Sequence, residues 1–162
     1  MLTLLQDDVM IDVRVAAEGR DDECEAIVRP ATDRQRHDLG RAAVGQAWMA
    51  WTPTGSELRT IKFMPPKPLR DRDSRELLKS YRFALRVAET YEVTTLALPL
   101  PEQAGLSRPE EVLEGELIHT LLGECGALRH LRHLRLHASG EQEAVRYADR
   151  LADHQRRHGQ SA

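Results

Sequence analysis

A helix, a short apolar strand and a loop follow one another between residues 80 and 112, and this order constrains the fold more than any other feature of the chain. The apolar residues of the helix recur at the spacing of one helix face, at Tyr81, Ala84, Leu85 and Ala88. Residues 93–98 form a compact run rich in strand formers, which breaks at Pro99. Because open α/β sheets bind ligands at the carboxyl ends of their strands, we expect a ligand loop after Pro99.

Strand-like and helical patterns alternate along the rest of the chain. The predicted strands are residues 2–5, 9–16, 26–28, 47–51, 60–64, 94–98 and 131–136. The predicted helices are residues 33–44, 74–91, 109–122 and 141–158. This order is typical of an α/β domain in which helices cover both faces of a mixed, mostly parallel sheet. The interior is predicted to contain Ile27, Val28, Ile61, Leu96 and Leu98.

The length and composition favour a single domain over residues 1–162. With 162 residues, of which 41% are hydrophobic, the chain suits one full core. The turn-rich stretches at 18–23 and 65–73 are too short to separate two domains. The polar tail, residues 156–162, is expected to fray.

The sequence favours a cytoplasmic protein. No apolar run approaches the roughly 20 residues that span a bilayer. The first apolar run is interrupted by Gln6, Asp7 and Asp8, so we expect neither a membrane segment nor a signal peptide. The chain has two cysteines, Cys24 and Cys125, which is normal for a reducing compartment. Neither belongs to a C-x-x-C pair and the sequence has no H-E-x-x-H, so we predict no metal site and no cofactor.

The overall charge limits the partners that the sequence predicts. A formal net charge of −3, from 23 basic and 26 acidic residues, argues against a protein whose whole surface attracts nucleic acid. Local basic patches are compatible with this balance. Nucleic acid is therefore not among the expected partners.

The 80–112 segment resembles the macro domain family, whose members bind ADP-ribose and in some branches remove it from proteins. The family's run here is a Tyr on a helix with L..A.E, then S-I-A-F-P, then a glycine-containing phosphate loop closed by a second proline. This chain has Tyr81, Leu85 and Glu89, then T-L-A-L-P ending at Pro99, and then Pro109. The interval between the two prolines is the one expected from the family.

Other parts of the family pattern appear in the same order. L-T-L-L-Q-D-D-V at 2–9 resembles the first strand and its G-D-I end, and E-A-I-V-R-P-A-T at 25–32 resembles D-A-I-V-N-A-A-N. Residues 45–66 and 143–151 resemble the later G-E-A … I-H-T-V-G-P run and the closing helix. The resemblance spans nearly the whole chain and implies a three-layer α/β/α sandwich. Residues 11–23 are an apparent insertion that could add a strand or hairpin arm.

The resemblance implies three groups of ligand-binding residues. An adenine amino group would meet Asp8 and Val9, although Asp7-Asp8 equally suits a solvated turn between two strands. The distal ribose would meet Ala31 and Thr32. The diphosphate would lie on the loop after Pro99, at Glu102, Ala104, Gly105, Leu106 and Ser107.

The phosphate loop departs from the family pattern. Ala104 and Ser107 stand where the family has glycines, and Gly105 lies one position away. Glu102 adds a negative charge that would repel a phosphate unless it points outward. Arg108 could compensate for that charge.

The residues that would carry hydrolysis are also replaced. Arg29 and Thr32 stand where hydrolytic members have asparagines, and a guanidinium cannot act as a general base at neutral pH. Asp33 and Asp38 are the candidates for a replacement acid or base. We therefore nominate no catalytic residue and expect no appreciable ADP-ribosyl hydrolase activity.

The sequence thus predicts a diverged macro domain whose binding of ADP-ribose or a related nucleotide is weak or lost. Two alternatives stay open. One is a ligand-free interaction or structural subunit that contacts a protein partner or a second copy through the cleft or through an exposed Trp48 or Trp51. The other is an ADP-ribosyl hydrolase with rewired residues.

Overall fold

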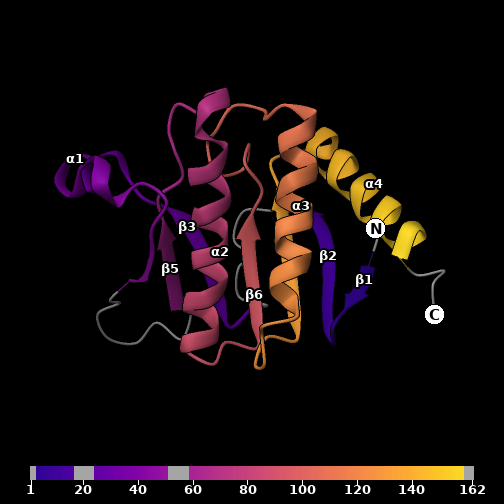
Figure 1. Ribbon diagram of the computed structural model, residues 1–162. Helices are drawn as coiled ribbons and strands as arrows, with labels where there is room; N and C mark the ends of the chain where they lie inside the picture. The colour runs from indigo at the N-terminus through magenta and orange to yellow at the C-terminus, as the bar shows by residue number, and fades with distance from the viewer. Residues whose placement is uncertain (1–2, 17–23, 51–58, 159–162) are drawn as a thin grey trace.

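A computed structural model describes residues 3–16, 24–50 and 59–158 (Figure 1). The strands in these ranges are β1 (Thr3–Gln6), β2 (Val9–Val15), β3 (Ala26–Pro30), β4 (Ala47–Met49), β5 (Arg59–Phe63), β6 (Thr95–Pro99) and β7 (His133–Ala138). The α-helices are α1 (Asp33–Leu39), α2 (Ser74–Thr90), α3 (Glu111–Cys125) and α4 (Glu141–His158). Two 3₁₀ turns, η2 (Arg41–Ala43) and η3 (Asp71–Asp73), complete the order.

The strands form one mixed sheet in the order β1-β2-β7-β6-β3-β5-β4. The pairings among β2, β7, β6, β3 and β5 are all parallel. The two outermost strands are antiparallel to their neighbours, β1 to β2 and β4 to β5. The predicted mixed, mostly parallel sheet and its α/β sandwich are therefore confirmed. The carboxyl ends of the five parallel strands lie along one side, the carboxyl edge of the sheet.

One face of the sheet forms the main core with α2, α3 and α4 (Figure 1). Every second residue of each strand points to this face, and Val28, Ile61, Leu96 and Leu98 are at most 1% exposed there. Ile27 is 6% exposed and packs with Cys24 and Ala97 in a separate small cluster. All five residues predicted to lie in the interior are thus buried.

Helix α2 packs on the sheet through a single apolar stripe. Tyr81, at the centre of this stripe, meets Phe63 edge-on with 5.1 Å between the ring centroids. The Tyr81 hydroxyl donates a hydrogen bond of 2.6 Å to the carbonyl oxygen of Pro99. This bond holds the helix against the end of β6, where the predicted ligand loop begins.

One predicted helix is longer than the helix in the structure. The helix predicted over 33–44 ends at Leu39, because Gly40 adopts a φ of 77° and a 3₁₀ turn follows. No residue of α1 is buried, and Figure 1 shows α1 projecting beyond β5. Residues 11–15 of the apparent insertion form part of a strand, as predicted: they belong to β2, which forms a hairpin with β1. The rest of the insertion, residues 17–23, and Trp51 lie outside the described residues.

No helix within the described ranges combines the length and the apolar content that crossing a bilayer requires.

Candidate functional site

Several loops leave the carboxyl edge and lead into helices; besides residues 64–70, which join β5 to η3 and α2, three of them concern the candidate ligand residues. Residues 31–32 join β3 to α1, residues 100–110 join β6 to α3, and residues 139–140 join β7 to α4. The first N–H groups of a helix lack partners within the helix, so its N-terminus favours an anion. These loops are the place where the fold would hold an anionic ligand.

The β6–α3 loop, residues 100–110, uses its early N–H groups within the protein. Those of Ala104, Gly105 and Leu106 donate to carbonyl oxygens earlier in the same loop at 2.9–3.0 Å. Ala104 and Leu106 are 5% and 6% exposed. Gly105 adopts a φ of 84°, a conformation that would strain a residue with a side chain. The loop is therefore wound on itself and does not present these three donors outward.

A buried carboxylate joins this loop to the next one. Glu143, in the first turn of α4, is 1% exposed. Its carboxylate accepts the backbone N–H of Glu102 and that of Ser139, each at 2.8 Å. The two donors belong to the β6–α3 and β7–α4 loops. An internal anion thus occupies N–H groups of the kind that bind phosphates in other proteins.

An ionic network continues from this point between α3 and α4. Arg146 pairs with Glu102, and its Nε lies 3.0 Å from the carboxylate of Glu114. Arg150 reaches the second oxygen of Glu114 at 3.4 Å. Glu114 is fully buried, so its charge depends on these two cations. The negative charge of Glu102, which we expected to repel a phosphate, is neutralised by Arg146.

Burial shifts the pKa of groups in this network and, at Cys125, of a group at the opposite end of α3. It raises the pKa of Glu143, although the hydrogen bonds from Ser139 and Glu102 act in the opposite direction. Burial, followed by the charge of Asp7, raises the pKa of Cys125 to about 12. Burial also raises the pKa of the Tyr147 hydroxyl above its usual value. Cys125 and Tyr147 are therefore protonated at neutral pH and supply no anionic nucleophile.

The β3–α1 loop also satisfies its own polar groups. The Thr32 hydroxyl accepts the N–H of Gln35 at 3.2 Å, and the Gln35 side chain accepts the N–H of Thr32 at 2.9 Å. This capping box begins α1. Ala31 is 6% exposed and its N–H donates to the carbonyl of Phe63 at 2.8 Å. The structure places Ala31 and Thr32 at the carboxyl edge, as predicted, with these donors engaged.

Asp8 and Val9 do not lie with the other predicted ligand residues. Asp7 and Asp8 form the turn between β1 and β2, at the amino end of β2 and so opposite the carboxyl edge. Asp7 lies against Gly126, past the C-terminal end of α3, whereas the ligand loop precedes the N-terminal end of that helix. Val9 is fully buried. The prediction that Asp8 and Val9 meet a base beside the β6–α3 loop is therefore wrong, and the turn interpretation of Asp7-Asp8 is correct.

The acids considered for catalysis are exposed and lie in surface ion pairs. Asp33 lies 3.8 Å from Lys67 with 91% of its side chain exposed, and Asp38 lies 3.9 Å from Arg34 with 62% exposed. Arg29 is exposed in β3, in register with Lys62 of β5. Within the described residues, no three His, Cys, Asp or Glu side chains are grouped so that they could hold a metal ion.

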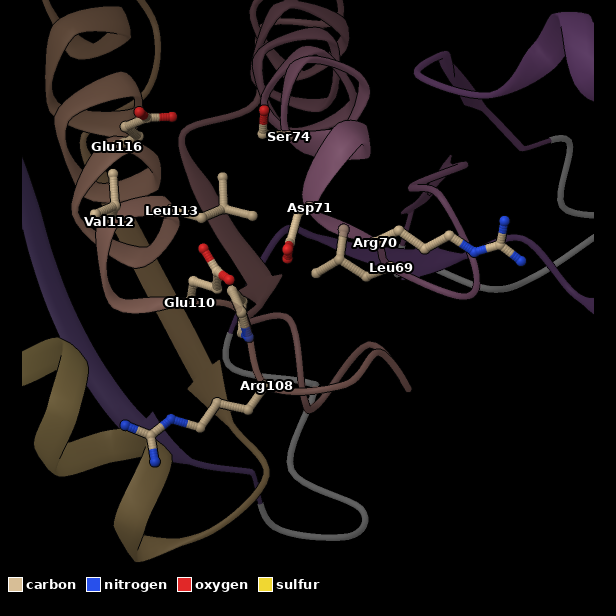
Figure 2. Close-up of a pocket in the computed structure, with 10 residues that line it drawn as sticks. Leu69, Arg70, Asp71, Ser74, Arg108, Glu110, Val112, Leu113 and Glu116 are labelled. Atoms are coloured by element: carbon tan, nitrogen blue, oxygen red, sulfur yellow. The ribbon is translucent and has the colours of Figure 1, made fainter.

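Two hollows flank the N-terminal end of α3. Figure 2 shows the first, between α2 and α3, where Arg70 and Arg108 direct their guanidinium groups away from the centre. Its volume is about 180 Å³, less than the roughly 300–1,000 Å³ typical of small-molecule sites. The second, of about 430 Å³, lies between α3 and α4, where Arg108, Arg146 and Arg150 contribute to its wall. Arg108 therefore faces the ionic network and does not point into the first hollow.

Glu143 and Arg146, which bind the polar groups of the loops at the carboxyl edge, are not among the ligand residues predicted from the sequence. Glu143 is four residues before Tyr147, and Arg146 is four residues before Arg150, so each pair shares a face of α4. That spacing was available in the sequence. Contact of this face with Glu102 and Glu114 depends on how α4 packs beside α3, which the spacing alone does not give.

Comparison with known proteins identifies the fold. No family model and no curated protein matches the chain. Solved macrodomain structures do match, among them that of Oceanobacillus iheyensis with ADP, at a TM-score of 0.73 and 12% identity over 96% of this chain and 97% of that chain. The Trypanosoma brucei macrodomain in complex with ADP has a TM-score of 0.64 and 14% identity, over 88% of this chain and 68% of that chain.

A third structure agrees with these two. The macro domain of ganglioside induced differentiation associated protein 2 matches with a TM-score of 0.64 and 14% identity, over 86% of this chain and 81% of that chain. At such low identity the likeness concerns the fold. The macro domain fold that the sequence implied is therefore confirmed.

Proposed function

We propose that this chain, which has the macro domain fold, is a single-domain nucleotide-binding module with weak affinity for ADP-ribose or a related nucleotide and without ADP-ribosyl hydrolase activity. The observation that carries the proposal is the carboxylate of Glu143, which accepts the N–H groups of Glu102 and Ser139. The candidate ligand residues are Ala31, Thr32, Glu102, Ala104, Gly105, Leu106 and Ser107.

The fold supports nucleotide binding by analogy. The solved macrodomains of Oceanobacillus iheyensis and Trypanosoma brucei include complexes with ADP. Fold alone does not determine function, so the analogy needs support from the site itself. That support is the convergence of the β6–α3 and β7–α4 loops at the start of α4, where donors for an anion are already present.

The internal anion supports weak affinity. A phosphate that reached the N–H of Glu102 would have to displace the carboxylate of Glu143, which is already hydrogen-bonded there at 2.8 Å. Hydrogen bonds to charged groups contribute about 1.5–3 kcal/mol each, and 1.4 kcal/mol is about tenfold in affinity. Exchange of one anion for another at these donors would therefore yield little net free energy.

The absence of hydrolysis follows from the polar groups available. Arg29 cannot act as a general base, and the Thr32 hydroxyl already accepts a hydrogen bond within the capping box. Asp33 and Asp38 are exposed, in surface ion pairs. A cytoplasmic location belongs to the same proposal, supported by Cys24 and Cys125, which are buried and form no disulfide.

The test is calorimetric titration with ADP-ribose, AMP and NAD, together with an assay for release of ADP-ribose from a modified protein. We expect a dissociation constant for ADP-ribose of about 0.1–1 mM, roughly −4 to −5.5 kcal/mol, and no release above the uncatalysed rate. A dissociation constant near 1 μM would contradict weak binding. Release at the rate of an active macrodomain hydrolase would contradict the absence of catalysis.

A role in protein contact is the second candidate. Val112, at the start of α3, is 71% exposed and contributes to the wall of the hollow in Figure 2 together with Leu69 and Leu113. Trp48, the other residue considered for such a contact, is half-buried in β4. If neither nucleotide binding nor hydrolysis is measurable at millimolar ligand, the contact role replaces the binding role.

A further inference from the structure

One side of helix α2 carries a row of cations. Spacings of four, three and four residues place them on one stripe of the helix. This α2 cationic stripe consists of Arg75, Lys79, Arg82 and Arg86. The opposite side of α2 is its apolar stripe, which packs into the core. Figure 1 shows α2 in front of the sheet, with no other element drawn over its outer side in this view. The methylene carbons of Lys79 lie against Gly45, at the flank of the helix.

The stripe has little compensating charge. Arg86 pairs with Glu124 of α3 at 3.3 Å, and 59% of its side chain stays exposed. In the part of the chain that the structure describes, Arg75, Lys79 and Arg82 form no ion pair. Of the acids on α2, Glu89 follows the stripe one turn after Arg86, where its carboxylate accepts the N–H groups of residues 129 and 130, and Glu76 lies at the side of the stripe.

An aromatic ring lies within the stripe. The Lys79 ammonium is 5.4 Å from the centre of the Phe83 ring, and the guanidinium carbon of Arg86 is 5.7 Å from it. Both distances are in the range of cation–π contacts. Phe83 is half-buried, so part of its surface reaches solvent between two cations.

This combination matches one class of ligand. The cations follow one another at about 4.5–6 Å along the helix axis and extend over about 16 Å. Proteins that bind single-stranded nucleic acids without sequence preference combine a line of cations along the backbone with aromatic rings on which bases stack. An acidic peptide would match the charge alone and leave Phe83 unused. We infer that the α2 cationic stripe binds the phosphate backbone of a single-stranded nucleic acid, with Phe83 against a base.

The net charge of −3 does not oppose this inference. Net charge averages over the whole surface, whereas phosphates respond to the local potential within about a Debye length of 8–10 Å. The stripe lies on the outer side of α2 and not on the candidate nucleotide loops. The inference is therefore independent of the proposed function, and ADP-ribose is not expected to displace the nucleic acid.

The test is fluorescence anisotropy of a labelled 20-nucleotide oligo-uridine with the full chain at low salt. Single-strand binding weakens with salt by a log–log slope of about −0.7 for each phosphate contacted, so four contacts predict about −3. The double substitution Arg75→Gln with Arg82→Gln removes two contacts. It should weaken binding at least tenfold and change the slope by about 1.4.

A matched control removes the same charge elsewhere. Arg34 of α1 and Arg156 of α4 have side chains that are 92% and 70% exposed, and each pairs with an acid of its own helix. Arg34→Gln with Arg156→Gln should change the affinity less than about twofold, because distant exposed charges are screened. Phe83→Leu should weaken binding about tenfold at an unchanged salt slope, as loss of stacking predicts.

Three results would overturn the inference. The first is an equal loss of affinity in the control pair and in the stripe pair. The second is competition by poly-glutamate as effective as that by unlabelled oligo-uridine, which would identify an acidic protein segment as the ligand. The third is no anisotropy change at about 100 μM protein and 50 mM salt, because non-specific sites bind nucleic acids at about 1–100 μM even at physiological salt.

Discussion

The carboxylate of Glu143 lies 2.8 Å from the backbone nitrogen of Glu102, and this contact joins α4 to the loop in which the fold would hold a diphosphate. The same carboxylate accepts the N–H of Ser139. Glu143 therefore holds two loops of the carboxyl edge in one arrangement. Removing it should affect both the stability of the protein and the ligands that this edge accepts.

Glu143→Ala should lower the free energy of unfolding by about 2–4 kcal/mol, because two partly buried N–H groups lose their charged acceptor. Urea denaturation at pH 7 measures this change. Glu141→Ala is the matched control, since Glu141 is exposed in the same helical turn and should change stability by less than about 0.5 kcal/mol. Equal effects of the two substitutions would mean that Glu143 does not hold the loops together.

The pH dependence of stability should report Glu143 directly. Its pKa is raised in the folded protein above the ordinary value of 4.5, so the folded state binds this proton more tightly than the unfolded chain does. The stabilisation is fully present below pH 4.5 and is lost as the pH rises through the raised pKa. The free energy of unfolding of the wild type relative to Glu143→Gln should therefore fall as the pH rises above 4.5.

The other shifted acids do not confuse this comparison. The pKa of Glu25 is lowered, chiefly by its hydrogen bond with the side chain of Thr94, so its contribution is lost as the pH falls. The wild type and Glu143→Gln share that contribution, and it cancels in the difference. A flat difference across this range would contradict a raised pKa for Glu143.

The two buried tyrosines should respond differently to loss of the hydroxyl. Tyr81 donates to the carbonyl of Pro99, whereas the Tyr147 hydroxyl is buried without a hydrogen-bond partner among the described residues. Tyr81→Phe should cost about 1–2 kcal/mol, and Tyr147→Phe should cost less than about 0.5 kcal/mol or stabilise the protein. Thermal and urea unfolding of both variants test this. A larger loss at Tyr147 would reveal a partner for its hydroxyl.

Two glycines inside α3 offer a test of packing between α3 and α4. A Cβ added at Gly123 would meet nothing within 4 Å, so Gly123→Ala should stabilise the protein by about 0.5–1 kcal/mol. A Cβ at Gly115 would lie 3.4 Å from Nη1 of Arg150. Because that group pairs with Glu114, the gain from Gly115→Ala should be smaller. Denaturant unfolding gives both values, and equal gains would mean that Arg150 adjusts freely.

The elements that depend on local pattern were predictable from the sequence. Helix α2 and strand β6 follow from the periodicity of Tyr81, Ala84 and Leu85 and from the β-branched run that ends at Pro99. The order of strands and helices then gave the mixed sheet. The early end of α1 depends on the positive φ of Gly40. It was not predicted, because the helical pattern of the sequence continues past Gly40.

The site was less predictable because it depends on contacts between distant residues. Asp8 was placed near the ligand loop by resemblance, but which end of the sheet a turn occupies depends on strand pairing, and β1 pairs antiparallel with β2. The contact of Glu143 with Glu102 joins residues 41 positions apart. The sequence shows a glutamate at each position. It does not show that the carboxylate of Glu143 accepts the backbone N–H of Glu102.

The central claim is that Glu143 occupies donors that the phosphates of a nucleotide would need. Calorimetric titration of ADP-ribose into the wild type, Glu143→Gln and the exposed control Glu141→Gln tests it most directly. Removing the buried negative charge should strengthen ADP-ribose binding about tenfold, or roughly 1.4 kcal/mol, in Glu143→Gln alone. An unchanged or weaker affinity in Glu143→Gln, with the fold intact by circular dichroism, would contradict the claim.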